Sequence, residues 1–289
     1  MAIKQCAILT MDSLEDFEAY DDLLIEPMAA AGWQLTFVSW RASNVDWGMF
    51  DVVLIRSPWD YQDDANAFLK VLEEIDSSSA VLENSLKTVK WNIDKIYLKE
   101  LEEKGVNIVP TLWREKLDAQ EFADFFRHFN GEQIILKPRI SANADNTYWL
   151  DRVKAEKNAN TLSQVFSDKP FMVQPFIGSV IEEGEYSLFY FDGKYSHAIL
   201  KTPKENDFRV QEEHGGRLNK IEPEAELLKR AEITLHAIGE MPMYARVDFV
   251  RYQDSFALME AELIEPSLYF NMDAQSAQRF TDAFVAKFG

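Results

Sequence analysis

Two β-strands joined by a short turn are predicted between Tyr244 and Pro266, and the charges they carry limit how the chain can fold. Side chains alternate along a strand, so Arg246 and Asp248 share one face of the first strand. For the same reason, Glu260 and Glu262 share one face of the second strand. The strand pair therefore brings three carboxylates and one guanidinium to one patch of sheet.

The turn decides which of these side chains meet. A three-residue loop at Gln253–Ser255 places Asp248 opposite Glu260. The same register pairs Arg246 with Glu262. Like charges about 4 Å apart repel by roughly 1 kcal/mol in water and roughly 4 kcal/mol at an effective dielectric constant near 20, so the cluster favours a bound cation. Oxygen ligands suit a hard ion such as Mg²⁺, and Asp248→Asn is expected to leave the stability of the ligand-free protein unchanged or raised.

A solvated strand face is the ordinary explanation of a Glu-x-Glu pair. The flanking residues argue against it, because they predict an apolar opposite face, made of Ala257, Met259, Ala261 and Leu263. Three further apolar residues are predicted at the ends of the acidic face itself: Phe256, Leu258 and Ile264. We therefore expect the acids to lie in a largely buried strand, where charges need partners or a metal.

Length and composition limit the class of protein. The 289 residues are 47% hydrophobic, which is enough to bury cores in two or three lobes. A formal net charge of −19 argues against a nucleic-acid or anionic-membrane partner. Because no apolar run approaches about 18 residues and Asp12 interrupts the first, we expect no signal peptide, no membrane span and a cytoplasmic protein. The single cysteine, Cys6, is expected to be a buried thiol, and self-assembly into oligomers is left open.

The first part of the chain predicts a parallel α/β sheet, where ligands bind at the carboxyl ends of strands. Its predicted strands are Cys6–Thr10, Gln34–Val38 and Val52–Ile55, and its predicted helices are Leu23–Ala31 and Ala65–Ile75. The third strand runs into RSPWDY, which makes Arg56, Trp59 and Tyr61 candidate substrate-binding residues. The alternative is a proline-containing turn over a packed aromatic ring. A break at Ser77–Ser79 marks a domain boundary near residue 85.

Several cations are predicted at the ends of elements in the rest of the chain. Asn92–Lys95 is predicted to open a helix, and Lys137 ends the apolar strand Gln133–Pro138. Lys201 ends a hairpin strand that begins after Asp192 and Gly193, a strong turn signal. Each lysine is a candidate anion contact, with snorkelling to solvent as the alternative. As an ordinary surface residue, Lys201 would tolerate replacement by Met at a cost of no more than about 0.5 kcal/mol.

The other predicted elements and loops complete this arrangement. A helix is expected at Asp118–Phe129, a strand at Phe171–Ile177 and a helix at Glu222–Ile238. Ser141–Thr147 is a small polar loop that is able to close over a ligand. An irregular stretch beyond Lys201 holds Arg209, His214, Gly215, Gly216 and Arg217, which indicates anion binding in an acidic protein.

Lysines at strand ends, an arginine-bearing glycine loop and an acidic strand pair together indicate a site for phosphate and magnesium. In this respect the chain resembles the ATP-grasp superfamily over about residues 85–270, and its first 85 residues resemble the domain that precedes ATP-grasp. VQPFI, GEYSLFYFDG, KTPKENDFRVQEEHGGR and ARVDF with EAELIEP are similar to glutathione synthetase and D-alanyl-alanine ligase. RSPWDY, the segment Asn92–Lys95, DFRVQ, HGG and LIEPSLYF are most similar to the cycloserine-forming cyclo-ligases, which act on O-ureido-serine.

The resemblance implies an α/β (α+β) ATP-grasp fold in which two lobes enclose ATP. An N-terminal parallel-sheet domain is expected at residues 1–85 and the ATP-grasp domain at 86–289, with a smaller lid lobe at about 111–175. Lys95, Lys137 and Lys201 would contact phosphates; Gln174, Phe176 and Ile177 would form the adenine hinge; Glu185 would lie near the ribose. The metal, Mg²⁺ with Mn²⁺ as an alternative, would be held by Asp248, Glu260 and Glu262, the last of which is usually Asn in relatives.

The resemblance also assigns chemistry. Arg209 and Arg246 would stabilise the reacting carboxyl group, and Gly215 and Gly216 would offer backbone N–H groups near His214. The loop SANADNT departs from the usual glycine-rich run, which puts its grip on the phosphate in doubt.

The implied function is an ATP- and Mg²⁺-dependent ligase that converts a small, amino-acid-like carboxylate into an acyl-phosphate and joins it to an amine, giving ADP and phosphate. An intramolecular cyclo-ligase and a catalytically inactive nucleotide sensor are the alternatives. A hydrolase finds no support, because the four histidines lack ligand spacing and no nucleophile-elbow motif occurs.

Overall fold

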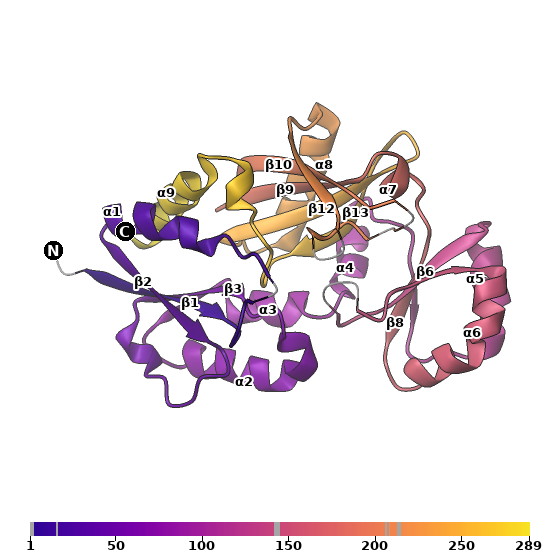
Figure 1. Cartoon of the computed structure of the whole chain (residues 1–289), viewed down its shortest axis with the longest axis horizontal. Coiled ribbons are helices and arrows are strands. Elements are labelled where there is room, and N and C mark those ends of the chain that lie inside the picture. The colour runs from indigo at the N-terminus through magenta and orange to yellow at the C-terminus, as the bar shows by residue number, and fades with distance from the viewer. Residues whose placement is uncertain (1–2, 16, 142–144, 206, 208, 213–214) are drawn as a thin grey trace.

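Three β-sheets lie next to one another and organise the chain (Figure 1). The computed structural model describes every residue except 1–2, 16, 142–144, 206, 208 and 213–214. One sheet is parallel and comes from the N-terminal part of the chain, and the other two are antiparallel. The predicted mixed α/β fold is therefore confirmed.

The first sheet is the parallel sheet that the sequence predicts. Its strands, in spatial order, are β2 (Trp33–Ser39), β1 (Lys4–Thr10), β3 (Val52–Ser57) and β4 (Val81–Glu83). It is accompanied by α1 (Ile25–Ala30), α2 (Ala65–Asp76) and α3 (Leu86–Asn92). All six residues of β3 are buried, as expected when a parallel sheet is covered on both faces. Cys6 is buried within β1, as predicted.

The second sheet forms the lobe at the right of Figure 1. Its strands, in spatial order, are β5 (Leu112–Arg114), β8 (Phe171–Pro175), β6 (Gln133–Pro138) and β7 (Tyr148–Asp151). Helices α5 (Phe122–Phe129) and α6 (Arg152–Val165) pack against it through an aromatic core that includes Phe125, Phe126 and Phe166. The sequence did not predict α6, because most of its residues are polar and only Ala155 and Leu162 are buried.

The third sheet carries most of the predicted polar residues. Its strands, in spatial order, are β11 (Arg217–Ile221), β10 (Lys194–Thr202), β9 (Glu185–Phe191), β12 (Tyr244–Tyr252) and β13 (Ser255–Glu262). Helices α4 (Tyr97–Glu103) and α8 (Ala225–Ile238) share a hydrophobic core with one face of it. Asp192 and Gly193 form the β9–β10 turn with positive φ angles of 45° and 73°, as the Asp-Gly pair predicts.

The C-terminal helix connects the third sheet to the first. Helix α9 (Ser276–Phe288) packs beside α1, so the two ends of the chain lie on the same side of the molecule (Figure 1). The rings of Trp33 and Phe284 meet edge to face, with their centroids 4.7 Å apart. The remaining short helices are α7 (Ser179–Glu182) and 3-10 turns at Asp21–Leu24, Trp47–Met49, Tyr61–Asp64, Ala119–Glu121 and Phe270–Met272.

The β12–β13 hairpin has the predicted register for a different reason. Tyr252 pairs with Ser255, so the turn contains two residues rather than the predicted three. An extra residue in β13, Met259, restores the pairing because it forms a bulge. Asp248 then lies opposite Glu260, as predicted, and Arg246 likewise opposite Glu262.

The same bulge corrects the predicted faces of β13. Phe256 and Leu258 belong to the core on the side away from the acids, and Ala257 and Met259 pack in a separate cluster beside the acidic face. The sequence analysis placed Phe256 and Leu258 on the acidic face and Ala257 and Met259 on the opposite face. It assumed strict alternation along the strand, and the inserted residue reverses that alternation.

The segment around Asn92 is also corrected. Asn92 is the last residue of α3, and the next helix begins only at Tyr97. The Asn92 side chain instead bridges β13: its amide donates to the carbonyl of Ala261, and its oxygen accepts from Leu263 N. The asparagine thus holds the strand that carries the acids.

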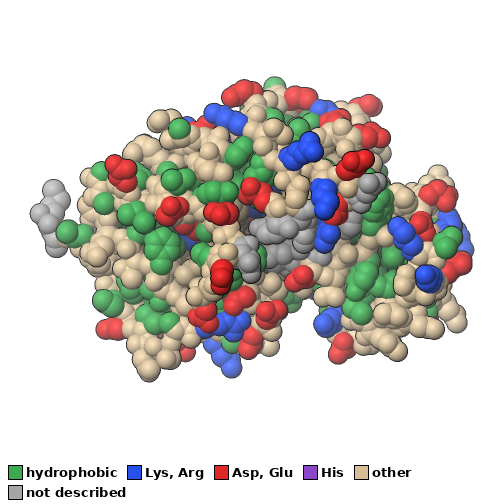
Figure 2. Space-filling view, viewed as in Figure 1, with side chains coloured by type: hydrophobic (Ala, Val, Ile, Leu, Met, Phe, Trp, Pro, Cys, Tyr) green, Lys and Arg blue, Asp and Glu red, His purple; other side chains and the backbone are tan. Residues whose placement is uncertain are grey.

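The surface agrees with an acidic chain. On the face shown in Figure 2, acidic side chains are spread over the molecule and basic side chains lie among them. In the described part of the chain, no helix combines the length and the apolar character needed to cross a membrane.

Buried His197 on β10 makes stability depend on pH. Its ring stacks on Phe189 with centroids 4.2 Å apart, and Nε2 lies 3.1 Å from the carbonyl oxygen of Leu268. Burial lowers the pKa of His197 to about 4. In the unfolded chain this histidine has a pKa of about 6.5, so it takes up a proton at a higher pH than it does in the folded state. The folded state therefore loses stability as pH falls from about 6.5 to 4.

We predict that His197→Gln removes this contribution while an amide N–H still donates to Leu268. Chemical denaturation at pH 7.5 and 4.5 should show that the parent loses about 2 to 3 kcal/mol more than the variant over this interval. Equal losses in both proteins would contradict the assignment.

Candidate functional site

One cavity lies where the three sheets meet, and most of the predicted site residues line it. From the predicted set, these are Trp59, Tyr61, Lys95, Lys137, Gln174, Phe176, Ile177, Glu185, Lys201, Arg209, Arg246, Glu260 and Glu262. Trp59 and Tyr61 follow β3, and Lys95 lies between α3 and α4. Lys137 and the segment from Gln174 to Ile177 belong to the second sheet or follow it directly. The remaining acids and cations, except Arg209, lie on the third sheet. Residues far apart in the sequence are therefore brought to one place.

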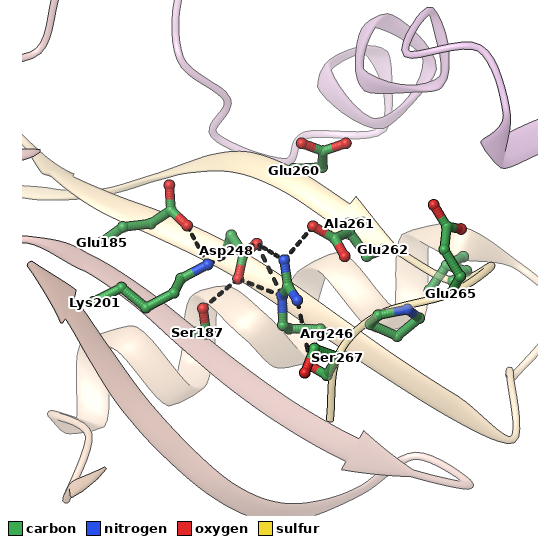
Figure 3. A network of polar contacts seen from close by, with 12 residues as sticks. Glu185, Ser187, Lys201, Arg246, Asp248, Glu260, Ala261, Glu262, Glu265 and Ser267 are labelled. Carbon is green, nitrogen blue, oxygen red and sulfur yellow. Dashed lines mark hydrogen bonds and ion pairs between the residues drawn. The ribbon is translucent and has the colours of Figure 1, made fainter. Parts of the chain in front are cut away.

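A buried network of ion pairs forms the floor of this cavity (Figure 3). Asp248 is 3% exposed and accepts hydrogen bonds from Ser187 Oγ at 2.5 Å and from Arg246 Nη2 at 3.1 Å. Arg246 also donates to the Glu262 carboxylate and to the carbonyl of Ser267. Burial raises the pKa of Asp248, but the charges of Arg246 and Lys201 outweigh this effect and hold the pKa below its usual value.

Lys201 completes the network from β10. Its Nζ lies 2.5 Å from Glu185 Oε1 and 3.5 Å from Asp248 Oδ2, and the residue is only 2% exposed. Burial would lower the pKa of Lys201, but the two carboxylates outweigh burial and raise it. The expectation of an ordinary surface lysine is therefore wrong, because this side chain neutralises two buried acids.

The other two lysines predicted to contact phosphate, Lys95 and Lys137, differ in whether their side chains have partners. Lys95 Nζ lies 3.2 Å from Glu260 Oε1 and donates to the carbonyl of Ser141 at 2.5 Å. The Lys137 side chain makes no hydrogen bond or ion pair with any residue that the structure describes. Burial lowers the pKa of Lys137, although the charge of Glu260 opposes the effect. An anion in the cavity would therefore find Lys137 available without breaking an existing contact.

The predicted metal ligands fit a cation only in part. Within the described ranges, no group of three acidic, His or Cys side chains is arranged to hold a metal ion. The Asp248 carboxylate already faces Ser187, Arg246 and Lys201. Glu260 and Glu262 border the cavity, and their side chains are 30% and 27% exposed.

The pKa of Glu262 lies above its ordinary value. Burial raises its pKa, and the neighbouring charges of Asp248 and Glu260 add to the rise although Arg246 opposes it. Glu260 and Glu262 face one cation each, Lys95 and Arg246, and their carboxylate oxygens are the kind of donor that suits a hard cation. The reason for expecting Asp248→Asn to leave stability unchanged or raised no longer holds, because Asp248 faces two cations and not only another acid.

The predicted adenine hinge lies along one wall of the cavity. Gln174 is 3% exposed and donates to Thr111 Oγ1 at 3.0 Å. The ring of Phe176 stacks on Trp149 with centroids 4.5 Å apart, while its backbone N–H donates to Gln133. These contacts hold the segment that ends β8 in a defined position beside the cavity.

Arg56 does not reach the cavity, which corrects its prediction as a substrate-binding residue. It is fully buried: Nε donates to Asp21 Oδ1 at 3.0 Å and Nη2 donates to the carbonyl of Pro266 at 2.9 Å. Its guanidinium lies 4.9 Å from the ring centroid of Tyr244. Arg56 therefore joins the first sheet to the segment after β13 instead of binding a ligand.

The glycine pair is corrected as well. Gly215 N–H donates to Glu212 O and Gly216 N–H to Gln211 O, so both donors are used within their own turn. A Cβ atom on Gly216 would lie 2.0 Å from Val210 O, so glycine is needed for this close approach. The turn brings Val210 and Gln211 to the cavity, whereas His214 lies outside the described residues.

Arg209 lines the cavity as predicted, but its guanidinium is held. Nη2 lies 2.8 Å from Asp207 Oδ2, and the side chain is 39% exposed. It lies at the rim and not in the buried network.

Glu265 lines the cavity and was missed by the sequence analysis. The available signal was a third acid in EAELIEP, three residues after Glu262. That segment was used only for its family resemblance.

Comparisons with known proteins agree with this geometry. The family model "D-cycloserine synthetase DcsG, N-terminal domain" matches residues 6–84. The cycloserine biosynthesis protein DcsG of Streptomyces lavendulae is 28% identical over 280 residues, which cover 91% of this chain and 92% of the relative. The crystal structure of D-cycloserine synthetase DcsG superposes with a TM-score of 0.89 at 27% identity, covering 99% of this chain and 100% of the other.

Other matches are more distant. A glutathione synthetase of Mesorhizobium japonicum is 27% identical over 182 residues, which cover 62% of this chain and 55% of the relative. The ATP-grasp ligase PsnB, solved with a precursor variant, Mg and ADP, matches with a TM-score of 0.69 at 16% identity, with 100% of each chain covered. That likeness concerns the fold alone.

Lys201, which is buried, and Lys137, which is half-buried, allow a matched test of the network. Lys201→Met leaves two buried acids without their cation and is expected to cost about 3 to 5 kcal/mol of unfolding free energy. Lys137→Met removes an unpaired charge and is expected to leave the ligand-free stability unchanged or raised. Urea denaturation of both variants checks this, and equal effects would contradict the described pairing.

Proposed function

We propose that this chain is an ATP-grasp ligase and, within that class, an intramolecular cyclo-ligase. It would activate the carboxylate of an O-ureido-serine-like amino acid as an acyl-phosphate, after which a nitrogen of the same molecule displaces the phosphate. One observation carries the choice: the similarity to the cycloserine-forming protein spans 91% of the chain, including the N-terminal sheet that brings Trp59 and Tyr61 to the cavity.

The cavity residues suit the nucleotide. Lys137 is the proposed first contact for the phosphates because it has no partner among the described residues, and Lys95 adds a second cation beside it. Gln174, Phe176 and Ile177 are the proposed adenine wall, and Glu185 is the proposed ribose contact. Lys201 would contact the terminal phosphates while it still pairs with Glu185 and Asp248.

Glu260 and Glu262 are the proposed Mg²⁺ ligands, and Mn²⁺ is an alternative. The metal would neutralise phosphate charge as the terminal phosphoryl group transfers. Asp248 remains a proposed third ligand, on condition that Arg246 and Lys201 give up part of their contacts with it. Binding of the polyanionic nucleotide supplies new anionic partners for those cations.

Two arginines are proposed to stabilise charge on the reacting carboxyl group. Arg246 is held by Asp248, Glu262 and the carbonyl of Ser267, so it is oriented toward the cavity before a ligand binds. Arg209 lies at the rim, where release from Asp207 would let it follow the substrate.

An intermolecular ligase is the second candidate, favoured by the similarity to glutathione synthetase over 62% of the chain. An inactive nucleotide sensor is disfavoured, because the three proposed phosphate lysines line the cavity together with Glu260 and Glu262. The boundaries at residues 1–85 and 86–289, with a lid lobe at 111–175, are kept as proposals. The cytoplasmic location, the lack of a nucleic-acid partner and the oligomeric state stay predictions.

The reaction is tested by product analysis. With ATP, Mg²⁺ and O-ureido-serine, mass spectrometry should show a cyclised product and ADP in equal amounts. Lys137→Met should weaken ATP binding by about tenfold or more, because it removes a charged contact to a polyanion. Lys99→Met, at an exposed position on α4, is the matched control and should bind ATP normally.

Two other outcomes would contradict the proposed cyclo-ligase in different ways. Formation of AMP and pyrophosphate would refute the acyl-phosphate mechanism. A condensed product that needs a second amine would select the intermolecular ligase instead.

A further inference from the structure

The charged side chains that line the cavity pair almost completely with one another. Lys95 pairs with Glu260, Lys201 with Glu185, Arg246 with Glu262, and Arg209 with nearby Asp207. Among the described residues of the lining, Lys137 and Glu265 have no ion-pair partner. They carry opposite charges and come from different parts of the molecule, β6 and the segment after β13.

Glu265 is held in place by the N-terminal sheet. The indole Nε1 of Trp59 donates to its carbonyl oxygen at 2.8 Å, and Arg56 donates to the carbonyl of the next residue, Pro266. The Tyr61 hydroxyl lies near the Glu265 carboxylate and acts to lower its pKa. Figure 3 shows this carboxylate set apart from the contacts between Arg246 and Asp248.

A carboxylate in this position lacks the solvation it would have in water. Burial raises the pKa of Glu265 to about 7, and the charge of Glu260 adds to the rise. The charge of Lys95, the Tyr61 hydroxyl and the charge of Arg246 oppose the shift without cancelling it. A ligand that brings a positive charge would remove this cost.

The side chains beside Glu265 suit an ammonium group. Trp59 and Tyr61 border the same cavity, and aromatic rings accept a cation on their faces. Lys137, the other unpaired charge, suits an anion. The cavity is therefore complementary to ligands that carry both signs of charge.

We propose that Glu265, positioned by Tyr61, binds the ammonium group of the substrate and so makes the enzyme select amino acids over carboxylic acids that lack the amino group. This inference rests on the proposed function and adds to it the residue that recognises the substrate class. Tyr61 is a positioning residue, because its hydroxyl orients the carboxylate.

The test compares two probes that differ only in the amino group: O-ureido-serine and its deamino analogue, 3-(ureidooxy)propanoate. Calorimetry uses the whole protein with Mg²⁺ and a non-hydrolysable ATP analogue, so that binding is separated from turnover. The parent should prefer the amino acid by about 10- to 100-fold, the size of a charge-assisted hydrogen bond. Glu265→Gln should abolish this preference without changing the affinity for the nucleotide.

The matched control is Glu102→Gln, which removes the same charge at an exposed position on α4 and should keep the preference. Tyr61→Phe should reduce the preference less than Glu265→Gln does.

Folding of the Glu265→Gln variant is checked by thermal unfolding. Because the folded-state pKa of Glu265 lies above that of the unfolded chain, stability falls as pH rises through about 7, so Glu265→Gln should raise the unfolding midpoint at pH 8 and not at pH 5.

Three results would overturn the proposal: a parent that binds neither probe, a parent that binds both equally, or a Glu265→Gln variant that retains the preference. The proposed function fails separately, through loss of nucleotide binding or of ADP formation. A parent that forms ADP with both probes equally would keep the ligase and remove Glu265 from recognition.

Discussion

The contact between Arg246 and Asp248 is the interaction on which the site depends. Both residues lie on β12 and are almost fully buried, so each charge needs the other. The network then extends to Lys201 on β10 and to Glu262 on β13, which joins three strands of the sheet through their side chains. Because a buried charge without a partner is costly, the strands are held in the register that supplies these partners.

A second set of contacts explains why the N-terminal sheet belongs to the site. Arg56 and Trp59 follow or end β3, and both donate to backbone carbonyls of Glu265 and Pro266. The segment after β13 is thereby fixed against a different sheet from the one it leaves. One wall of the cavity is consequently shared between the first and third sheets. The similarity to the cycloserine-forming protein also extends over this part of the chain, since the family model matches residues 6–84.

The balance of charge connects this architecture to the chemistry. An acidic chain with a net charge of −19 binds polyphosphate only where cations are placed locally. Most cavity cations are already neutralised by acids, which preorganises them but reduces their attraction for an anion. Lys137 keeps its charge available, and Glu265 keeps the opposite charge available at another wall. The ligand, rather than the protein, completes these two interactions.

The sequence by itself determined the parallel sheet, the Asp192–Gly193 turn and the gathering of the Asp248, Glu260 and Glu262 carboxylates on one strand pair. These features follow from local spacing, because alternation and turn chemistry act over a few residues. The adenine wall at Gln174–Ile177 was instead expected from the family resemblance. Only the tertiary structure decided that Arg56 is buried against Asp21, that the Gly215 and Gly216 N–H groups are already used, and that Glu265 faces the cavity. The partner of a side chain can lie far away in the sequence, 210 residues in the case of Arg56 and Pro266, and local patterns carry no information about such distances.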